Sequence, residues 1–274
     1  MSEPSLAIVI VSYDVRADLE RCLRSIVGRT APFPTTIAVV DNGSSDGTLD
    51  MVRGDFPTVH AIDAGSNVGF SRGNNLGIRA TSSDLVLLLN PDTEVPGGQV
   101  QVLVRALLAD SAAAAAGPRL VDAEGRAELS FGPMVSPWGE FTQRRLIRHY
   151  EAGHPWATRR VEQLTRQPGP HDWVSGACLL ARRADLEAVG LFDERYFMYT
   201  EDVDLCAAFR ARGRTVQFVP GTTVRHLRGR SAATASIATE TRRRQSQLAF
   251  YRKHHPAWAP LLAWWLRRRG VEVH

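Results

Sequence analysis

Four short apolar runs in the first 90 residues, separated by amphipathic segments, constrain the fold more than any other feature of this sequence. The runs lack polar alternation, which is typical of strands buried on both faces of a sheet, and they occupy residues 6–11, 37–40, 59–62 and 85–89. Apolar residues recur at helical spacing between them, in residues 18–27, 47–53 and 71–80. Strands that alternate with helices predict βαβ units and therefore an α/β fold.

The second half of the chain contains similar segments at wider spacing. The pattern predicts helices at 99–108, 184–189 and 201–212, strands at 174–181 and 215–219, and two helices within 238–269 interrupted at Pro256. The alanine run at 112–116 is interpreted as a buried packing segment. Residues 117–169 are rich in glycine, proline and arginine without clear periodicity, so we expect a long irregular excursion that faces a substrate.

Charge is distributed unevenly along the chain, although the net charge is only +4. From Arg225 onward, eleven arginine or lysine residues face only Glu240 and Glu272, so this tail carries +9 and the first 224 residues carry −5. Such asymmetry indicates a polyanionic partner, either nucleic acid or an anionic membrane surface, with a solvated basic tail as the alternative. The longest apolar run, at 256–266, is shorter than the roughly 18 residues of a spanning helix, so we expect no membrane crossing.

The cysteines indicate a compartment. Cys22, Cys178 and Cys206 are far apart and lack CxxC spacing, and no hydrophobic leader precedes Ser12. Both observations predict a reducing, cytoplasmic setting.

Polar and acidic residues follow two of the predicted strands at the point where each strand ends. The segment DNGSSDG begins at Asp41, and NPDT begins at Asn90. Ligands of doubly wound sheets bind outside the carboxyl ends of the strands. Either segment alone fits an Asx turn that caps the next helix, but the two together predict a ligand site.

Six segments in the following order carry a recognisable pattern: VVDNGSSDGT, SNVGFSRGNN, LLLNPDTEV, SGACLL, LFDERYFMYTEDVDLCAAFRARG and VRHLRGRS. They resemble the inverting nucleotide-sugar glycosyltransferases of family 2, GT-A type, and especially their rhamnosyltransferase-like branch. The resemblance spans about residues 6–231. It implies a GT-A type Rossmann-like nucleotide-binding fold with a mixed central sheet, with a nucleotide-binding half at about 1–116 and an acceptor-binding half at about 117–231. Residues 232–274 are expected to form a basic and aromatic helical extension at the C-terminus.

The resemblance assigns one group of residues to the nucleotide-sugar: Ser12, Asp41, Asn67, Gly69, Arg72, Asn74, Asn90 and Asp92. It implies that Asp41 accepts a hydrogen bond from the nucleobase imide, although a turn with Gly43 would use the same side chain. Free backbone N–H groups at a helix start, together with Arg72, suit a phosphate or a nucleoside. Asn74 also fits an ordinary helix-terminus residue.

A divalent metal, Mn²⁺ or Mg²⁺, is expected beside the diphosphate. The leaving diphosphate gains negative charge, and a divalent ion that bridges both phosphates stabilises it. Asp92 offers a carboxylate oxygen, although Asn90 replaces the first acid of the usual Asp-x-Asp pattern. By resemblance, His226 lies near the diphosphate as a metal ligand, and its nitrogen favours Mn²⁺ over Mg²⁺. Arg228 and Arg230 are expected to bind the diphosphate or an acceptor pyrophosphate.

Glycosyl transfer needs a base that takes the proton of the acceptor hydroxyl. Residues 200–204 supply three carboxylates at the start of a predicted helix, where the helix dipole stabilises anions. Successive helical residues point about 100° apart, so Glu201 and Asp202 cannot do the same job. By resemblance, Asp202 is the general base, Glu201 binds the acceptor and Asp204 is structural.

The segment that opens with Trp173 resembles the acceptor-side strand of the family. The small Ser175-Gly176 step lets a sugar approach, which makes Gly176 a shape-giving residue. Trp173 either stacks on that sugar or belongs to the core.

The resemblance implies an inverting, metal-assisted glycosyltransferase in polysaccharide or cell wall biosynthesis. It would move a sugar, L-rhamnose from dTDP-rhamnose in this branch, to a hydroxyl of a saccharide or a lipid-linked glycan. Two alternatives stay open: a non-catalytic nucleotide-sugar binding module, and a family 2 transferase that uses a UDP-sugar and a small-molecule acceptor.

The C-terminal residues suggest what the protein binds and where in the cell it lies. Aromatic, leucine and basic residues alternate in residues 251–269, which suits either peripheral contact with the inner face of a membrane or packing in a homodimer. A nucleic-acid partner is not expected, because it would leave the acidic strand ends unexplained.

Overall fold

The computed structural model describes residues 3–227 and 237–271. The first elements are β1 (Leu6–Ser12), α1 (Arg16–Ile26), β2 (Thr35–Asp41), α2 (Thr48–Asp55), β3 (His60–Asp63), α3 (Phe70–Arg79) and β4 (Leu85–Leu89). They are followed by β5 (Thr93–Glu94), α4 (Gln99–Ala109), β6 (Ala113–Val121), β7 (Phe131–Gly132), α5 (Pro137–Glu151), α6 (Pro155–Leu164) and β8 (Gly169–His171). The remaining elements are β9 (Trp173–Val174), β10 (Cys178–Arg182), α7 (Arg183–Ala188), α8 (Glu201–Ala211), β11 (Thr215–His226), α10 (Ile237–His254) and α11 (Ala259–Arg268). The alternation of strands and helices through β4 is therefore as predicted.

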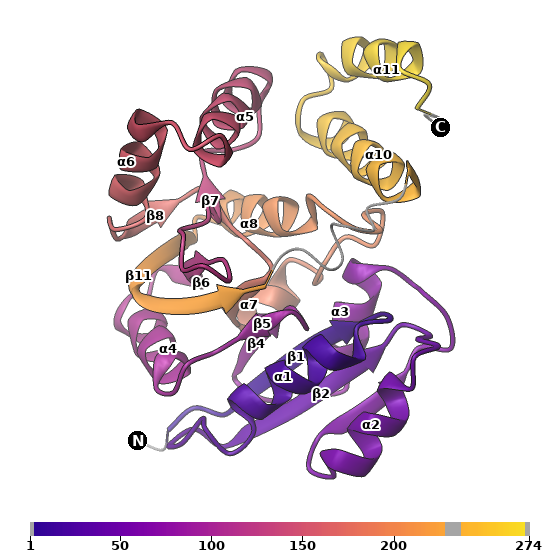
Figure 1. Ribbon diagram of the computed structural model, residues 1–274, viewed down its shortest axis with the longest axis vertical. Helices are drawn as coiled ribbons and strands as arrows, with labels where there is room; N and C mark the ends of the chain where they lie inside the picture. Colours follow the sequence, from indigo (N-terminus) through magenta and orange to yellow (C-terminus); the bar gives the residue numbers. More distant parts are fainter. Residues whose placement is uncertain (1–2, 228–236, 272–274) are drawn as a thin grey trace.

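A mixed sheet forms the centre of the molecule, with strand order β3-β2-β1-β4-β10-β6-β11-β5 and with β8 beside β11 (Figure 1). The strands β3, β2, β1 and β4 are parallel. β10 runs antiparallel between β4 and β6, so its first residue, Cys178, lies opposite Leu89 at the end of β4. β11 is parallel to β6 and antiparallel to β5. The carboxyl ends of β1, β2, β4 and β11 therefore share one edge with the start of β10.

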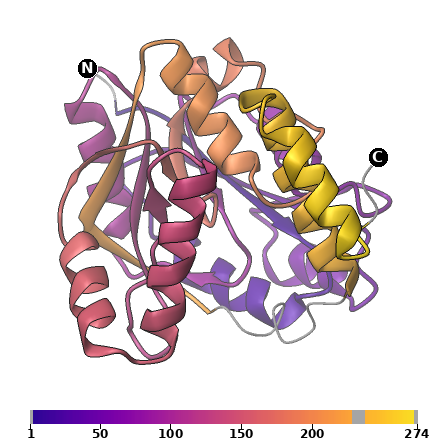
Figure 2. The same ribbon diagram turned by 90° about the horizontal axis from the view of Figure 1, so that it is seen from above.

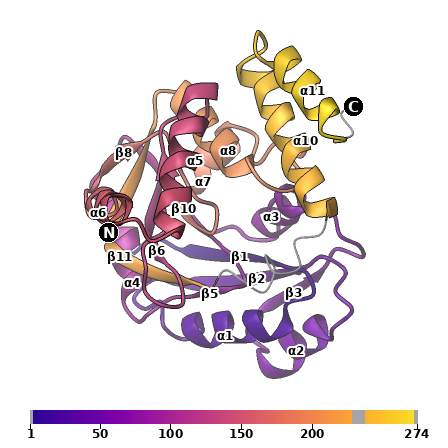
Figure 3. The same cartoon turned by 45° about the horizontal axis from the view of Figure 1, so that its top comes forward.

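Alternate residues of the central strands face two hydrophobic layers, because successive side chains of a strand point to opposite faces. On β1, Leu6, Ile8 and Ile10 pack with residues of α1, α2 and α4, whereas Ala7 and Val9 pack with residues of α3, α7 and α8. Figure 3 shows α1 and α2 beneath the sheet and α3 above it. Burial on both faces explains why these strands are apolar without alternation.

Residues 117–169 are more regular than predicted, so the expectation of a long irregular excursion is wrong. β6 continues to Val121, and α5 and α6 follow. Each of these helices has a proline in its first turn, and Ser136 caps α5 by accepting a hydrogen bond from the backbone N–H of Gly139. α5 buries none of its residues, so no apolar stripe marks it in the sequence.

Two predicted strand boundaries also differ. β11 continues past Val219 to His226, with a register shift against β6 between Val219 and Thr223. The intervening Pro220-Gly221 is thus an irregularity within a strand rather than its end. The predicted strand 174–181 is divided, because β9 pairs with β7 in a separate two-stranded sheet and β10 begins only at Cys178.

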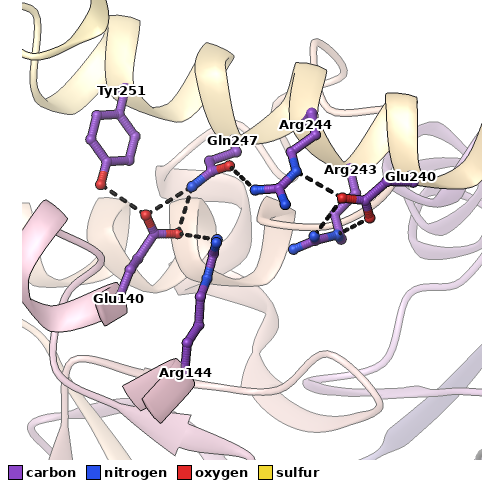
Figure 4. Close-up of polar contacts among 7 residues, drawn as sticks. All are labelled: Glu140, Arg144, Glu240, Arg243, Arg244, Gln247 and Tyr251. Carbon is purple, nitrogen blue, oxygen red and sulfur yellow. Dashed lines mark hydrogen bonds and ion pairs between the residues drawn. The ribbon is translucent and has the colours of Figure 1, made fainter. Parts of the chain in front are cut away.

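The two helices predicted around Pro256 are present as α10 and α11, which lie along one side of the molecule (Figure 2). A polar network fixes α10 to α5 (Figure 4). Glu140 of α5 accepts hydrogen bonds from Nε2 of Gln247 and from the hydroxyl of Tyr251, at 2.8 Å and 2.9 Å. None of the helices within the described ranges combines the length and the apolarity that crossing a bilayer requires.

Candidate active site

Ser12 and Asp41 lie side by side at the carboxyl ends of β1 and β2, where the strand register pairs them. Both are buried, and Asp41 Oδ2 accepts a hydrogen bond from the backbone N–H of Ser44 at 3.1 Å. Within the described residues, neither Asp41 Oδ1 nor Ser12 Oγ has a hydrogen-bond partner. Because buried polar atoms are normally paired, the turn uses one oxygen of Asp41 and leaves the other for a ligand that donates a hydrogen bond.

The turn before α3 is packed against the segment that leads to α8. Gly69 has φ +87°, and a Cβ there would lie 2.6 Å from the carbonyl oxygen of Phe197, so the position requires glycine. The backbone N–H of Phe70 donates to that same carbonyl at 2.6 Å. Asn67 Oδ1 accepts from the N–H of Gly69, and Asn42 Nδ2 donates to the carbonyl of Gly69. These bonds bring Asn67 and Gly69 beside the end of β2.

Arg72 and Asn74 have different surroundings on α3. Arg72 is exposed, whereas Asn74 is buried. Asn74 Nδ2 donates to the carbonyl of Phe70 at 3.0 Å, which is a contact within its own helix. The geometry therefore leaves Arg72 open to a ligand and gives Asn74 a local structural contact.

β11 carries His226 to a position opposite Thr93 of β5, and this register places His226 beside Asp92. His226 Nε2 lies 3.3 Å from Asp92 Oδ1, and the two side chains are 7% and 16% exposed. The other ring nitrogen, Nδ1, lies 3.1 Å from Oε2 of Glu128. Burial lowers the pKa of His226, but the hydrogen bonds to Asp92 and Glu128 outweigh burial and raise it to about 9.

Glu128 is a residue of this cluster that the sequence analysis missed. It follows a hairpin in which Val121 pairs with Ala127, and its own N–H donates to the carbonyl of Leu120 at 2.9 Å. Its side chain is only 10% exposed. The one available signal was the turn from Asp122 to Gly125, whose glycine has φ +80°, because such a turn returns the chain to the strand edge.

The side chains near Asp92 fit a divalent cation that is shared with a diphosphate. Asn90 Oδ1 is buried and has no hydrogen-bond partner in the described part of the chain. Asp92 and His226 supply oxygen and nitrogen atoms that face each other, and a cation that binds His226 would displace the proton that the raised pKa retains on the ring. Across the described residues, no group of three or more His, Cys, Asp or Glu side chains is placed to hold a metal ion by itself. A cation here would complete its coordination with phosphate oxygens and water.

The predicted base and the predicted acceptor strand meet directly. Asp202 Oδ2 accepts a hydrogen bond from the backbone N–H of Gly176 at 2.9 Å. A Cβ on Gly176 would lie 3.3 Å from the Cβ of Asp202, so the glycine permits this approach. The carbonyl of the next residue, Ala177, accepts from the N–H of Asn90 at 2.9 Å. One short run of backbone therefore joins Asp202 to the segment that contains Asn90 and Asp92.

Glu201 lies in the interior next to Asp202. It is 7% exposed, and its Oε2 has no hydrogen-bond partner among the residues that the structure describes. Burial, reinforced by the charge of Asp202, raises the pKa of Glu201 well above its ordinary value of 4.5. The acceptor-binding role predicted for Glu201 therefore applies to a buried carboxyl group whose pKa is raised.

The raised pKa of Glu201 predicts how the Glu201→Gln variant responds to pH. Below about pH 4.5, Glu201 is protonated in both the folded and the unfolded chain. The melting temperatures of the wild type and the variant should therefore change with pH in the same way. As the pH rises from 4.5 towards the folded pKa, only the unfolded chain loses the proton, so the wild type loses stability and the variant does not. We expect the melting temperature of the variant, relative to the wild type, to increase from pH 4.5 to pH 8. A constant difference in melting temperature between the two proteins across this range would contradict the raised pKa of Glu201.

The backbone that presents Asp202 is strained, and α10 packs against it. Tyr199 and Thr200 have φ +70° and +73°, a region that L-residues rarely adopt. Ser246 Oγ of α10 donates to the carbonyl of Met198 at 2.8 Å. Arg242 of α10 lies over the ring of Phe197, 4.1 Å from its centroid. The C-terminal helix thus contacts the turn that starts α8.

Asp204 connects α8 to α10 in a buried cluster, in agreement with its predicted structural role. It is 3% exposed. Its oxygens lie 2.8 Å from Lys253 Nζ and 2.6 Å from His254 Nε2, and it accepts a hydrogen bond from the hydroxyl of Tyr196. Breaking such a cluster would leave a buried charge without its partner, which is costly.

Trp173 is not brought into this arrangement. Trp173 donates its indole N–H to the carbonyl of Pro133 at 2.9 Å and packs against two hydrophobic clusters, which is the core alternative left open for it. Arg228 and Arg230 lie outside the described residues.

Comparisons with known proteins agree with this architecture. The family described as "Glycosyltransferase like family 2" matches residues 4–258. The N-acetylglucosaminyl-diphospho-decaprenol L-rhamnosyltransferase of Mycobacterium tuberculosis is 33% identical over 284 residues, covering 96% of this chain and 89% of the relative.

Two solved structures share the fold at low sequence identity. The mannosyltransferase PcManGT of Pyrobaculum calidifontis, in complex with GDP-Man and Mn²⁺, superposes with a TM-score of 0.63 at 17% identity, over 96% of this chain and 69% of that one. GalNAc-T7 with UDP, GalNAc and Mn²⁺ gives 0.63 at 15% identity, over 89% and 47%. With a family match over most of its length and a relative 33% identical over 96% of it, this chain belongs to the family 2 glycosyltransferases, and its fold is of the GT-A type.

Proposed function

We propose that this glycosyltransferase moves L-rhamnose from dTDP-rhamnose to a hydroxyl of a lipid-linked glycan, with inversion at the anomeric carbon, at the cytoplasmic face of a membrane. The Mycobacterium tuberculosis relative is named for L-rhamnosyl transfer to N-acetylglucosaminyl-diphospho-decaprenol, which supports both the sugar and the lipid-linked acceptor. In this proposal, residues 1–116 bind the nucleotide-sugar and residues 117–231 bind the acceptor.

The observation that carries the proposal is the continuous arrangement at the carboxyl edge of the sheet. It runs from Asp202 through Gly176 and Ala177 to Asn90, and then from Asp92 to His226. The backbone of Gly176 and Ala177 therefore links a carboxylate suited to proton abstraction to the segment whose oxygen atoms suit a metal-bound diphosphate. Single-displacement transfer needs these two functions on opposite sides of one anomeric carbon.

On the acceptor side, Asp202 removes the proton of the attacking hydroxyl. The N–H of Gly176 fixes Oδ2 of this carboxylate, so the base is oriented before the acceptor arrives. Attack from the face opposite the nucleotide inverts the anomeric centre. The buried carboxyl of Glu201, whose pKa is raised well above its ordinary value, completes the acceptor side.

On the nucleotide side, Asp41 Oδ1 accepts the imide N–H of the base, and Ser12 lies beside it. Asn67, Gly69 and Arg72 line the ribose and phosphates. Asn90, Asp92 and His226 would hold a divalent cation, for which Mn²⁺ suits the mixed oxygen and nitrogen set. Such an ion supplies positive charge to the leaving diphosphate, and Arg228 and Arg230 add to that charge.

A thermal-shift panel tests the proposed nucleotide-sugar site. The protein is melted with dTDP, UDP, GDP or CDP, each with EDTA, Mg²⁺ or Mn²⁺. We expect dTDP with Mn²⁺ to give the largest rise in melting temperature, about 2.7 kcal/mol of stabilisation at a hundredfold excess over Kd. A metal-dependent shift with UDP alone would favour a UDP-sugar instead. No shift with any nucleotide would contradict the proposal.

The Glu128→Met variant tests how His226 is positioned. Glu128 accepts a hydrogen bond from Nδ1 and thereby directs Nε2 towards Asp92, as carboxylates do for metal-binding histidines. We expect the apparent Kd for Mn²⁺ in the presence of dTDP to rise about 10- to 100-fold. Glu128→Gln keeps an acceptor oxygen and should recover most of this affinity. Glu162→Met, which removes a carboxylate paired with Arg119, is the matched control, and an effect of the same size there would contradict the assignment.

A further inference from the structure

The helix α11 is apolar on two sides, and only one side is covered. Ala259, Ala263 and Leu266 are buried in a hydrophobic cluster with residues of α10. On another side, Trp258, Leu261 and Trp264 recur every three residues and are 50%, 55% and 49% exposed. Two half-exposed indoles and a leucine on one side of a short helix form an apolar surface that needs an explanation.

Basic residues flank this apolar surface, although Arg243 and Arg244 pair with Glu240, and Lys253 pairs with Asp193 and Asp204. Between Glu240 and Glu272 the chain contains no acidic residue but eight basic ones, namely Arg242, Arg243, Arg244, Arg252, Lys253, Arg267, Arg268 and Arg269. The three arginines at the end of α11 are exposed, and Arg268 stacks over the ring of Trp264 at 4.3 Å. Arg269 stacks over Trp265 at 4.2 Å. Such stacking leaves each guanidinium at the rim of the apolar surface, where it can contact anions.

A shallow groove of about 380 Å³ lies between the end of α10 and α11. Arg252 and Arg267 line it together with Pro256, Ala259, Pro260 and Ala263. Guanidinium groups bind phosphate oxygens with two parallel hydrogen bonds, whereas the proline and alanine side chains offer only apolar contacts. The combination suits a phosphate group that is attached to a hydrocarbon.

The surface belongs to the acceptor side of the molecule. The hydrophobic cluster that holds α11 includes Tyr196 and Val203, which flank the turn before Asp202 and the start of α8. Trp173, Met134 and Val135 pack against the same cluster. Figure 2 shows α11 at the outer side of the molecule, and the exposure of Trp258, Leu261 and Trp264 agrees with this position.

We propose that α11 lies on the surface of a bilayer that contains anionic phospholipids, with Trp258, Leu261 and Trp264 at the boundary between headgroups and acyl chains. The arginines at positions 252 and 267–269 contact the lipid phosphates. Tryptophan prefers this boundary, and each basic residue near an anionic surface strengthens attachment about fivefold. The inference deepens the proposed function and rests on it in one respect, namely that the lipid-linked acceptor reaches Asp202 from this surface.

Charge favours a lipid surface over a second copy of the chain. In a two-fold symmetric dimer the same patch meets itself. Two sets of arginines would then face each other, and the stretch between Glu240 and Glu272 offers no carboxylate to separate them. Anionic headgroups supply the missing negative charge.

Vesicle co-sedimentation of the full chain tests the proposal in the absence of any nucleotide or acceptor. We compare vesicles of phosphatidylcholine alone with vesicles that contain about 30% phosphatidylglycerol, at low and high salt. The wild type should bind the anionic vesicles, bind them less at high salt, and bind the neutral vesicles weakly. The charge variant Arg267→Gln/Arg268→Gln/Arg269→Gln should bind on the order of 100-fold less.

A second variant and a control separate membrane contact from folding. Trp258→Ser/Leu261→Ser/Trp264→Ser removes the exposed apolar side chains and should lose at least about tenfold in vesicle binding, since it gives up most of the buried hydrocarbon. Trp156→Ser removes an equally exposed indole from α6 and should bind as the wild type does. The dTDP-induced melting shift of each variant reports folding and the nucleotide site independently of lipid.

Three results would overturn the proposal. The first is wild-type protein that does not bind anionic vesicles, and the second is unchanged binding by both variants. The third is a wild-type dimer in sedimentation velocity that the Trp258→Ser/Leu261→Ser/Trp264→Ser variant abolishes, because the surface would then be an interface between copies. Failure of the nucleotide panel would contradict the proposed function alone and leave the vesicle result standing.

Discussion

The Asp202→Asn variant should lose about 10³-fold in kcat for sugar transfer, because an amide cannot take the proton of the acceptor hydroxyl. The substitution is conservative in geometry. The amide oxygen of asparagine can accept the bond that Oδ2 receives from the N–H of Gly176 at 2.9 Å, whereas the bond that Oδ1 receives from the N–H of Val203 at 2.8 Å is lost. Nucleotide binding should persist. The measurement is steady-state transfer together with the dTDP-induced melting shift.

Two other variants make the Asp202→Asn result specific. Glu201→Gln replaces a buried carboxyl, whose pKa is raised towards the neutral form, with a neutral amide of similar size, so its kcat should fall less than about tenfold even if the KM for the acceptor rises. Asp172→Asn removes a charge elsewhere in the acceptor half, where Asp172 pairs with Arg210, and should leave transfer largely intact. A fully active Asp202→Asn enzyme would contradict the assignment of Asp202 as the base. An inactive Glu201→Gln enzyme would indicate that Glu201 is the base instead.

The first half of the fold, residues 1–116, could be predicted from sequence because its physics is local. Strands buried on both faces must be apolar along their length, so residues 6–11 and Leu85–Leu89 stand out without any partner being known. Parallel strands connected by helices bring their carboxyl ends to one edge. That rule alone places Asp41 and Asn90 in the same neighbourhood, and the structure agrees.

The contacts around His226 could not be predicted in the same way, because they depend on long-range register. His226 reaches Asp92 only because β11 continues through Pro220-Gly221 and then pairs with β5. Glu128 joins them from a hairpin 98 residues away in sequence. The spacing of residues in the sequence does not indicate a contact between such distant segments. The family resemblance pointed to His226 but not to Glu128.

The second half of the fold shows a second limit of sequence patterns. Helices reveal themselves by an apolar stripe, yet α5 buries no side chain and is fixed to α10 by the polar contacts of Glu140 with Gln247 and Tyr251 (Figure 4). Polar contacts between distant segments do not produce a regular spacing of apolar residues that could be detected in the sequence. The positive φ angles of Tyr199 and Thr200 are also invisible in sequence, because neither residue type marks a left-handed turn.

The second large effect is expected for Asp92→Ala, which should abolish the metal dependence of nucleotide binding. The variant removes a carboxylate oxygen that faces Nε2 of His226 at 3.3 Å, and with it the only acidic side chain of the Asn90–Asp92 segment. If the apparent Kd for dTDP with Mn²⁺ rises 100-fold, a nucleotide concentration that stabilises the wild type by about 2.7 kcal/mol stabilises the variant by only about 0.4 kcal/mol. At roughly 2–4 °C per kcal/mol, the melting shift falls from several degrees to about one.

Asp84→Ala is the matched control for Asp92→Ala, since both aspartates flank β4 but at opposite ends. Asp84 accepts hydrogen bonds from Ser5 at the amino end of the strand, far along β4 from the candidate site. Its loss should lower the melting temperature of the free protein and leave the nucleotide-induced shift unchanged. Asp92→Ala should remove the nucleotide-induced shift, and it should also lower the melting temperature of the free protein, because it takes away a carboxylate that raises the pKa of the buried His226. If the Asp92→Ala variant kept a Mn²⁺-dependent melting shift with dTDP, the cation would bind elsewhere. That result would also contradict the role of His226 as a metal ligand.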